Sequence, residues 1–106
     1  DAQKLMLKAH FKALNRSISF TQLAEAAGYD SHTAANSQYG KLGHMLGDAL
    51  NFDFYILTAE DGASNIGDPF YSSAIGMGNA YKKDPFELVM HHELAKALYR
   101  LGWFND

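Results

Sequence analysis

The segment from Thr33 to His44 carries the side chains best suited to recognise another molecule. Read as a helix, it presents a polar face made of Thr33, Asn36, Ser37, Gly40, Lys41 and His44, with Gln38 flanking that face. Asn and Gln can bind the edge of adenine with two hydrogen bonds, Lys can reach guanine or phosphate, and Ser or Thr can contact either. The set predicts a helix that reads DNA, although the exposed face of an ordinary helix is polar as well.

The rest of the sequence offers little chemistry of its own. His91, His92 and Glu93 are adjacent, and neighbours on a helix point about 100° apart, so they need a third element to hold a metal ion. Cysteine is absent, which excludes disulfides, thiolate zinc sites and cysteine nucleophiles. No nucleophile elbow, phosphate-binding loop or dinucleotide fingerprint occurs. We expect a protein that is not an enzyme and that has no metal or cofactor.

Charge is distributed unevenly along the chain. The formal net charge is −3, which argues against a generically basic nucleic-acid binder, because Lys and Arg supply the sequence-independent affinity for phosphate. Most acidic residues lie in the second half, and five of the nine basic residues lie in the first, namely Lys4, Lys8, Lys12, Arg16 and Lys41. We expect a positive stripe beside the third helix if the partner is DNA, and scattered lysines if it is a protein.

Length and hydropathy indicate one domain. With 106 residues, the chain can bury a core without metals or disulfides, so residues 1–106 form a single unit. No apolar run approaches the roughly 20 residues of a membrane-spanning helix, and no signal peptide is visible. We expect a cytoplasmic protein with no membrane association.

Three helices are predicted in the first half. Helical spacing of apolar residues indicates the first, over residues 1–15. Ser19 and Gln22 make a capping box that starts the second helix at Phe20, and Gly28 can end it. Asp30 or Ser31 can cap the third helix, over residues 33–50.

The third helix combines a core stripe with costly glycines. The stripe steps by four, three, four and three through Ala35, Tyr39, Leu42, Leu46 and Ala49. Gly40, Gly43 and Gly47 each cost about 1 kcal/mol of helix propensity relative to Ala. Such a cost suggests a close approach, either by another backbone or by a phosphate.

Strands are predicted next. Residues 52–58 and 70–77 are rich in aromatic and β-branched residues and flank a loop over residues 60–69, so they would pair antiparallel as a hairpin. A turn over residues 78–83 holds Lys82 and Lys83, which could touch phosphate or the minor groove as a wing tip, or lie in an ordinary solvated turn.

The end of the chain allows two interpretations. Asp84, Pro85 and Glu87 make a helix-start signal, and an apolar stripe continues to Gly102. The competing interpretation is a short strand over residues 86–89 followed by a helix from His91.

The helix pair carries a recurring phrase. It consists of Phe20, Leu23, Ala24, Ala26, Gly28 and Tyr29, then Ala34, Asn36, Gln38, Tyr39, Gly40 and Leu42. This phrase resembles that of the winged-helix domains fused to HNH and other nucleases in bacterial modification-dependent restriction systems. The clear match covers about a third of the chain. The resemblance implies an α+β winged helix, with three N-terminal helices, a β-hairpin wing and a C-terminal helix.

The resemblance also implies a function, that of a module binding double-stranded DNA and sensing a modified base within a restriction or defence system. The nuclease itself is missing. The acidic second half and the absence of catalytic residues favour an alternative, a protein-interaction winged helix that acts as a homodimerising subunit or as an inhibitor encoded by a mobile element.

Overall fold

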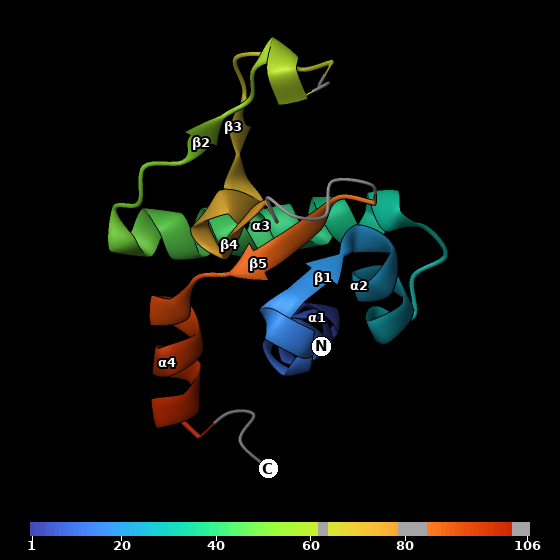
Figure 1. Ribbon diagram of the computed structural model, residues 1–106, viewed down its shortest axis with the longest axis vertical. Coiled ribbons are helices and arrows are strands. Elements are labelled where there is room, and N and C mark those ends of the chain that lie inside the picture. Colours follow the sequence, from blue (N-terminus) through green and yellow to red (C-terminus); the bar gives the residue numbers. More distant parts are fainter. Residues whose placement is uncertain (62–63, 79–84, 103–106) are drawn as a thin grey trace.

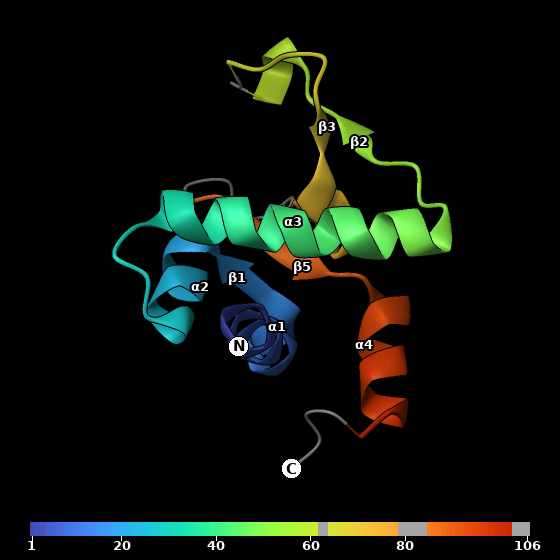
Figure 2. The same ribbon diagram turned by 180° about the vertical axis from the view of Figure 1, so that it is seen from behind.

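Helix α3 (His32–Leu50) crosses the middle of the molecule. In Figure 1, α1 (Ala2–Lys12) and α2 (Phe20–Ala27) lie below it, and α4 (His92–Arg100) lies below its C-terminal end. A small sheet runs beside α3, and a two-stranded arm rises on the side away from α1 and α2, as the view from behind also shows (Figure 2). The chain is therefore a mixed α+β structure, as the sequence predicts.

This computed structural model describes residues 1–61, 64–78 and 85–102. Within those residues, none of the helices has both the length and the apolar character needed to cross a membrane.

The predicted helix caps are confirmed. Ser19 Oγ accepts a hydrogen bond from the Gln22 amide at 3.1 Å, and Gln22 Oε1 accepts one from the Ser19 amide at 3.0 Å. Gly28, with a φ of 78°, ends α2 in the left-handed conformation. Of the two candidate caps for α3, Ser31 is the one used, because its Oγ accepts from the Ala34 amide at 3.3 Å.

The strands form two separate antiparallel sheets. In the larger sheet, β5 (Glu87–Met90) lies between β1 (Ser17–Ser19) and β4 (Gly76–Gly78). In the smaller one, β2 (Tyr55–Ile56) pairs with β3 (Pro69–Phe70). Short 3-10 turns η1 (Leu14–Arg16), η2 (Ala59–Asp61) and η3 (Tyr71–Ala74) connect the elements.

The strands predicted over residues 52–58 and 70–77 are wrong in extent. Their antiparallel pairing survives only as the short ribbon of β2 and β3. The second predicted strand is split by η3, after which β4 joins the other sheet. The split arises because η3 packs against α3, which turns the chain away from the direction of β3.

A helix starting at Asp84 and Pro85 is also wrong, since Glu87–Met90 is strand β5 and α4 begins at His92. The competing interpretation, a strand followed by a helix from His91, is confirmed to within one residue. Pairing of β5 on both edges, with Leu88 and Met90 buried, outweighs the local helix-start signal. Asp84 itself lies outside the described residues.

The core lies between α1, α2, α3 and β5. Its buried apolar residues are Met6, Leu7, Phe11, Ile18, Leu23, Ala24, Ala35, Tyr39, Leu42, Ile75, Leu88, Met90, Ala95 and Leu98. Of the stripe predicted on α3, the first three members are in this core and Leu46 packs against it. Ala49 is exposed, so the predicted stripe leaves the core after Leu46.

Two of the three glycines in α3 mark close approaches. A Cβ at Gly43 would overlap the backbone carbonyl of Tyr71, and a Cβ at Gly47 would overlap the ring of Phe54. Gly40 differs, since nothing lies within 4 Å of the position that its Cβ would occupy. The predicted approach of another backbone is thus confirmed at Gly43.

The glycines provide a matched pair of variants. We expect Gly43→Ala to destabilise the fold by about 1 to 3 kcal/mol, because the added methyl group forces η3 away from α3. Gly40→Ala should instead stabilise it by up to about 1 kcal/mol through helix propensity alone. Urea unfolding of both variants tests this, and equal stabilisation by the two would contradict the contact at Gly43.

A histidine is buried at the centre of the fold. His10 Nε2 donates to the Leu88 carbonyl at 2.8 Å, and His10 Nδ1 accepts from the Tyr39 hydroxyl at 2.7 Å. The carbonyl can only accept, so Nε2 carries a proton, and the lowered pKa of His10 keeps the ring neutral near pH 7, which leaves Nδ1 as the acceptor. Burial lowers the pKa of His10 to about 4, although the hydrogen bond to Leu88 acts in the opposite direction.

This pKa predicts acid sensitivity. Between the ordinary value of 6.5 and about 4, the unfolded chain binds a proton at His10 and the folded chain does not. The contribution of neutral His10 to the free energy of unfolding is therefore fully present above pH 6.5, and it falls as the pH drops towards 4. We expect the wild type to lose about 2 to 3 kcal/mol more than His10→Gln between pH 7.5 and pH 4.5 in urea unfolding. Parallel profiles for the two proteins would refute a neutral buried His10.

Candidate nucleic-acid interface

The polar face predicted on α3 points away from the core. Thr33, Asn36, Ser37 and Lys41 are exposed, while Ala35, Tyr39 and Leu42 on the other side are buried. This separation follows from helical periodicity, because the two sets occupy different faces of one helix.

Gln38 lies apart from that group. It is half-buried, and its backbone carbonyl accepts a hydrogen bond from Gln3 Nε2 of α1 at 3.3 Å. It lines none of the cavities beside the polar face. The structure thus places Gln38 towards α1, and Thr33 is exposed but lines neither cavity. The other predicted residues of α3 lie beside the arm, namely Asn36, Ser37, Gly40, Lys41 and His44.

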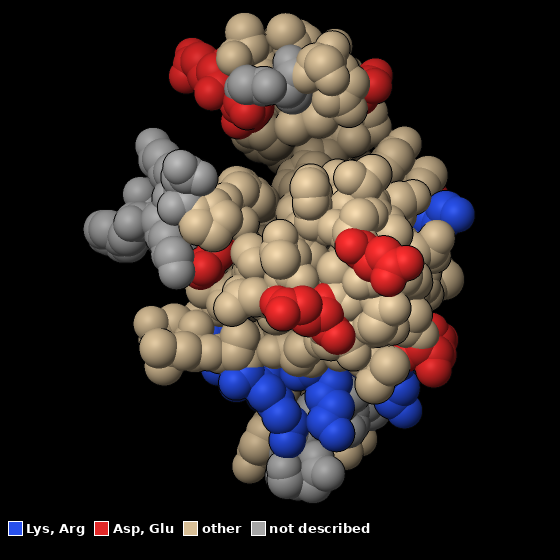
Figure 3. Space-filling view, turned by 90° about the vertical axis from the view of Figure 1, so that its right-hand side faces the viewer, with Lys and Arg blue, Asp and Glu red and all other residues tan. Residues whose placement is uncertain are grey.

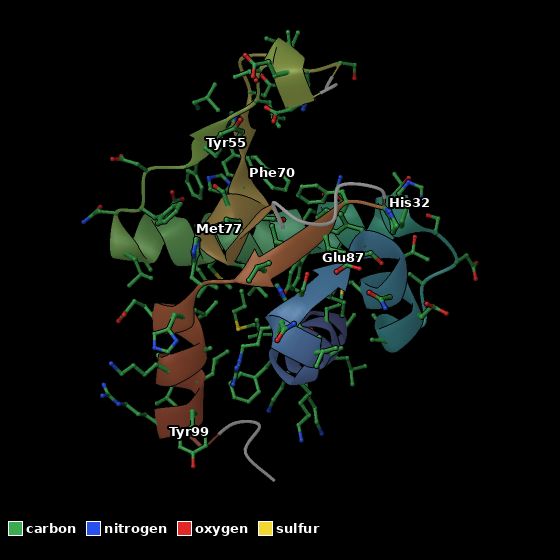
Figure 4. The ribbon with its side chains drawn as sticks, in the orientation of Figure 1. His32, Tyr55, Phe70, Met77, Glu87 and Tyr99 are labelled. Carbon is green, nitrogen blue, oxygen red and sulfur yellow. The ribbon has the colours of Figure 1, made fainter. Side chains whose placement is uncertain are left out.

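The arm comprises residues 52–70, of which 62–63 are not described. It contains β2, η2 and β3, and it rises from the side of α3 opposite to α1 and α2 (Figures 1 and 2). Tyr55 and Phe70 lie on its two strands (Figure 4). Sequence patterns predicted a hairpin here, but not that it would stand over the polar face.

Aromatic contacts fix the base of the arm to α3. The rings of His44 and Tyr71 stack with centroids 3.9 Å apart and planes at 9°. Phe54 meets Tyr71 edge-on at 5.0 Å, and its ring occupies the space beside Gly47. The Tyr55 amide also donates to Ser73 Oγ at 3.0 Å. His44 is therefore part of the packing that holds the arm, as well as part of the predicted polar face.

A groove separates the arm from α3. We call one end the polar end; its cavity of about 460 Å³ is lined on α3 by Asn36, Ser37, Gly40, Lys41 and His44, and on the arm side by Leu57, Asn65, Pro69, Phe70, Tyr71 and Ser72. The structure therefore brings most of the predicted polar set together in one groove.

The other end, which we call the aromatic end, has a cavity of about 540 Å³. Its lining residues are Phe20, Asn36, Tyr55, Leu57, Glu60, Asp61, Phe70 and Phe86. Asn36, Leu57 and Phe70 line both cavities, so the two ends adjoin each other. Phe20, Phe70 and Phe86 come from distant parts of the sequence, which is why no local pattern predicted this end.

Asp61 organises the tip of the arm. Its Oδ2 accepts hydrogen bonds from the Thr58 amide at 2.8 Å and the Thr58 hydroxyl at 3.0 Å. The Tyr55 hydroxyl donates to the same carboxylate at 3.0 Å. The amide of Thr58 is the main cause that lowers the pKa of Asp61, and the hydrogen bond to Asp61 raises the pKa of Tyr55. Together with exposed Glu60, Asp61 makes the aromatic end acidic.

The lysines of α1 do not line this groove. They are exposed on a helix that packs on the core side of α3. Figure 3 shows most of the visible Lys and Arg gathered towards the end of the molecule opposite to the arm, and the arm itself carries Asp and Glu. Among the described residues that line the groove, Lys41 is the basic one besides His44. The positive stripe expected beside α3 is therefore absent from the described part of the chain, and Lys82 and Lys83 lie outside it.

No three His, Asp or Glu side chains within the described ranges gather closely enough to hold a metal ion. Comparisons of this chain with protein-family models, with curated proteins and with solved structures each found no match. The sequence and the geometry of the groove therefore carry the functional argument.

The stack of His44 on Tyr71 can be measured directly. We expect a double-mutant cycle of His44→Ala and Tyr71→Ala to give a coupling energy of about 0.5 to 1.5 kcal/mol in urea unfolding, because stacked rings stabilise each other beyond their buried area. The matched control is the cycle of His44→Ala with Tyr99→Ala, which removes an exposed ring on α4. A coupling no larger than that of the control would show that the ring stack does not hold the arm.

Proposed function

We propose that this chain is a winged-helix module that binds double-stranded DNA through the N-terminal half of α3. The order of elements supports the proposal, because α1, β1, α2 and α3 are followed by the antiparallel strands β4 and β5, and β1 pairs with β5. In winged-helix domains a strand after the first helix joins the hairpin in this way. The hairpin of β4 and β5 would be the wing, in place of the one predicted over residues 52–77.

The exposed part of α3 supplies the reading residues. Asn36 can bind adenine, Ser37 and Thr33 can contact bases or phosphates, and Lys41 can reach phosphate or guanine. The open space at Gly40 allows a phosphate to approach the helix backbone. Tyr71 of η3 covers Gly43 and Phe54 of the arm covers Gly47, so contact with a duplex is confined to the first half of the helix.

The charge distribution sets the expected strength of binding. Lys41 is exposed on α3, and the sequence puts Lys82 and Lys83 between β4 and β5, the two strands of the proposed wing. Three phosphate contacts correspond to a salt dependence of only about −3 in log K against log salt concentration. Binding should therefore be weak, with a dissociation constant in the micromolar range or above. Use in a restriction or defence system, and reading of a modified base there, rest on the sequence resemblance alone.

Fluorescence anisotropy with a labelled 20-base-pair duplex at low ionic strength tests the proposal. We expect Asn36→Ala to weaken binding about tenfold on an adenine-containing site, because the pair of hydrogen bonds from the Asn amide to the base is lost. Lys41→Ala should reduce the salt slope by about 0.9, as expected for one phosphate contact.

Lys8→Ala is the matched control, since Lys8 is exposed on α1, on the core side of α3. It should leave both the affinity and the salt slope unchanged. Absence of any duplex binding by the wild type at low ionic strength would overturn the proposal.

A second candidate function is protein binding by the same fold. The observation that favours it is the surface of the arm, which is acidic and exposes Ile56 and Ile66 at 50% and 59%. The distance of the α1 lysines from the groove points the same way. The version in which the partner is a second copy of the chain predicts a dimer in sedimentation equilibrium that dissociates in Ile56→Asp. A strictly monomeric wild type would exclude that version. Under both candidate functions, DNA binding and protein binding, we propose that the chain has no catalytic activity of its own.

A further inference from the structure

The two ends of the groove have opposite chemical character. At the polar end, Lys41, Ser37 and the open backbone at Gly40 suit a phosphate group. At the aromatic end, Glu60 and Asp61 repel phosphate, while the surrounding rings offer apolar faces. A ligand that fills both ends must therefore carry an anion and a flat apolar group a short distance apart.

The rings at the aromatic end have exposed surface. Phe20 and Phe86 lie nearly parallel, with planes at 11° and centroids 6.2 Å apart, and Phe70 meets Phe86 edge-on at 6.3 Å. Phe86 and Tyr55 remain 43% and 49% exposed. Exposed rings of this kind are the platforms on which unpaired bases stack.

Polar groups around these rings match the edge of a base. Asn36 lines both ends and offers an amide that can donate and accept. The carboxylate of Glu60 can accept from an exocyclic amine, such as the one on cytosine or adenine. Thymine has no such amine, so the acidic lining favours bases that do.

We propose that the groove between the arm and α3 holds one unpaired nucleotide of a DNA strand, with its base at the aromatic end and its phosphate at the polar end. This inference rests on the proposed function and deepens it. Cavities of about 460 and 540 Å³ lie within the usual range for small ligands, so the two adjoining ends can accept a single nucleotide. A base that enters the aromatic end has left its own helix, as it does in proteins that extrude a nucleotide.

Anisotropy titrations on two labelled duplexes test the inference. One duplex is fully paired, and the other carries a single unpaired cytosine at its centre. We expect the wild type to bind the second at least about tenfold more tightly, as the gain of one stacked base predicts.

Variants at the aromatic end separate this site from duplex reading. Phe86→Leu keeps an apolar side chain against Phe20 and Phe70 but removes the flat face, so it should abolish the preference for the unpaired cytosine and leave paired binding within about twofold. Tyr99→Leu is the matched control, because it removes an exposed ring from α4 and should change neither value. Figure 4 shows Tyr99 far from the arm.

A second variant covers the case in which Phe86→Leu does not fold. Glu60 is exposed, so Glu60→Gln should fold normally. It should reduce the preference for unpaired cytosine over unpaired thymine from about fivefold to none.

Each outcome decides between the proposals. Equal affinity for the paired and unpaired duplexes overturns the nucleotide site and leaves duplex reading intact. Binding of the unpaired duplex alone supports the site and overturns duplex reading by α3. No binding of either overturns both, and a preference that persists in Phe86→Leu and Glu60→Gln overturns the assignment to this groove.

Discussion

The hydrogen bonds of His10 join three elements that are far apart in the sequence. The ring lies on α1, its partners are the Tyr39 hydroxyl of α3 and the Leu88 carbonyl of β5, and all three residues are buried. Fixing Tyr39 inward sets the rotation of α3 about its own axis, which in turn directs Asn36, Gly40 and Lys41 outward. The polar face of α3 is thus a consequence of the core, and the neutral state of one histidine maintains it.

Sequence signals that involve only a few neighbouring residues predicted the structure correctly, whereas features that depend on partners far apart in the sequence were not predicted. The capping box at Ser19 and the left-handed Gly28 fix α2 from local sequence alone, and so the helix pair was predicted closely. Two interpretations of the start of α4 stay open from the sequence, because β5 forms only when β1 and β4 are present to pair with it. Helical spacing alone was enough to predict that the polar residues of α3 share one face. The aromatic end of the groove could not be predicted in this way, because Phe20, Phe70 and Phe86 come from three separate segments. Gln38 turns towards α1 and away from the groove, and the spacing of residues within α3 alone gives no sign of this contact with another helix.

Charge and shape act together around α3. The arm carries acidic residues and no Lys or Arg, while the basic side chains of α1 face away from it. An approaching polyanion is therefore repelled by the arm and finds its nearest favourable charge at Lys41, beside the open stretch of α3. This arrangement limits the orientations in which a nucleic acid can dock, even though it adds little to the overall attraction.

The empty space beside Gly40 has a practical consequence. Because the chain contains no cysteine, a single Gly40→Cys change would create one thiol for site-specific labelling. The new side chain would meet no heavy atom within 4 Å of its Cβ, and it would lie on a rigid helix at the floor of the groove. A fluorophore or spin label attached there would report on the polarity and crowding of the groove floor, and so on whether the groove is filled.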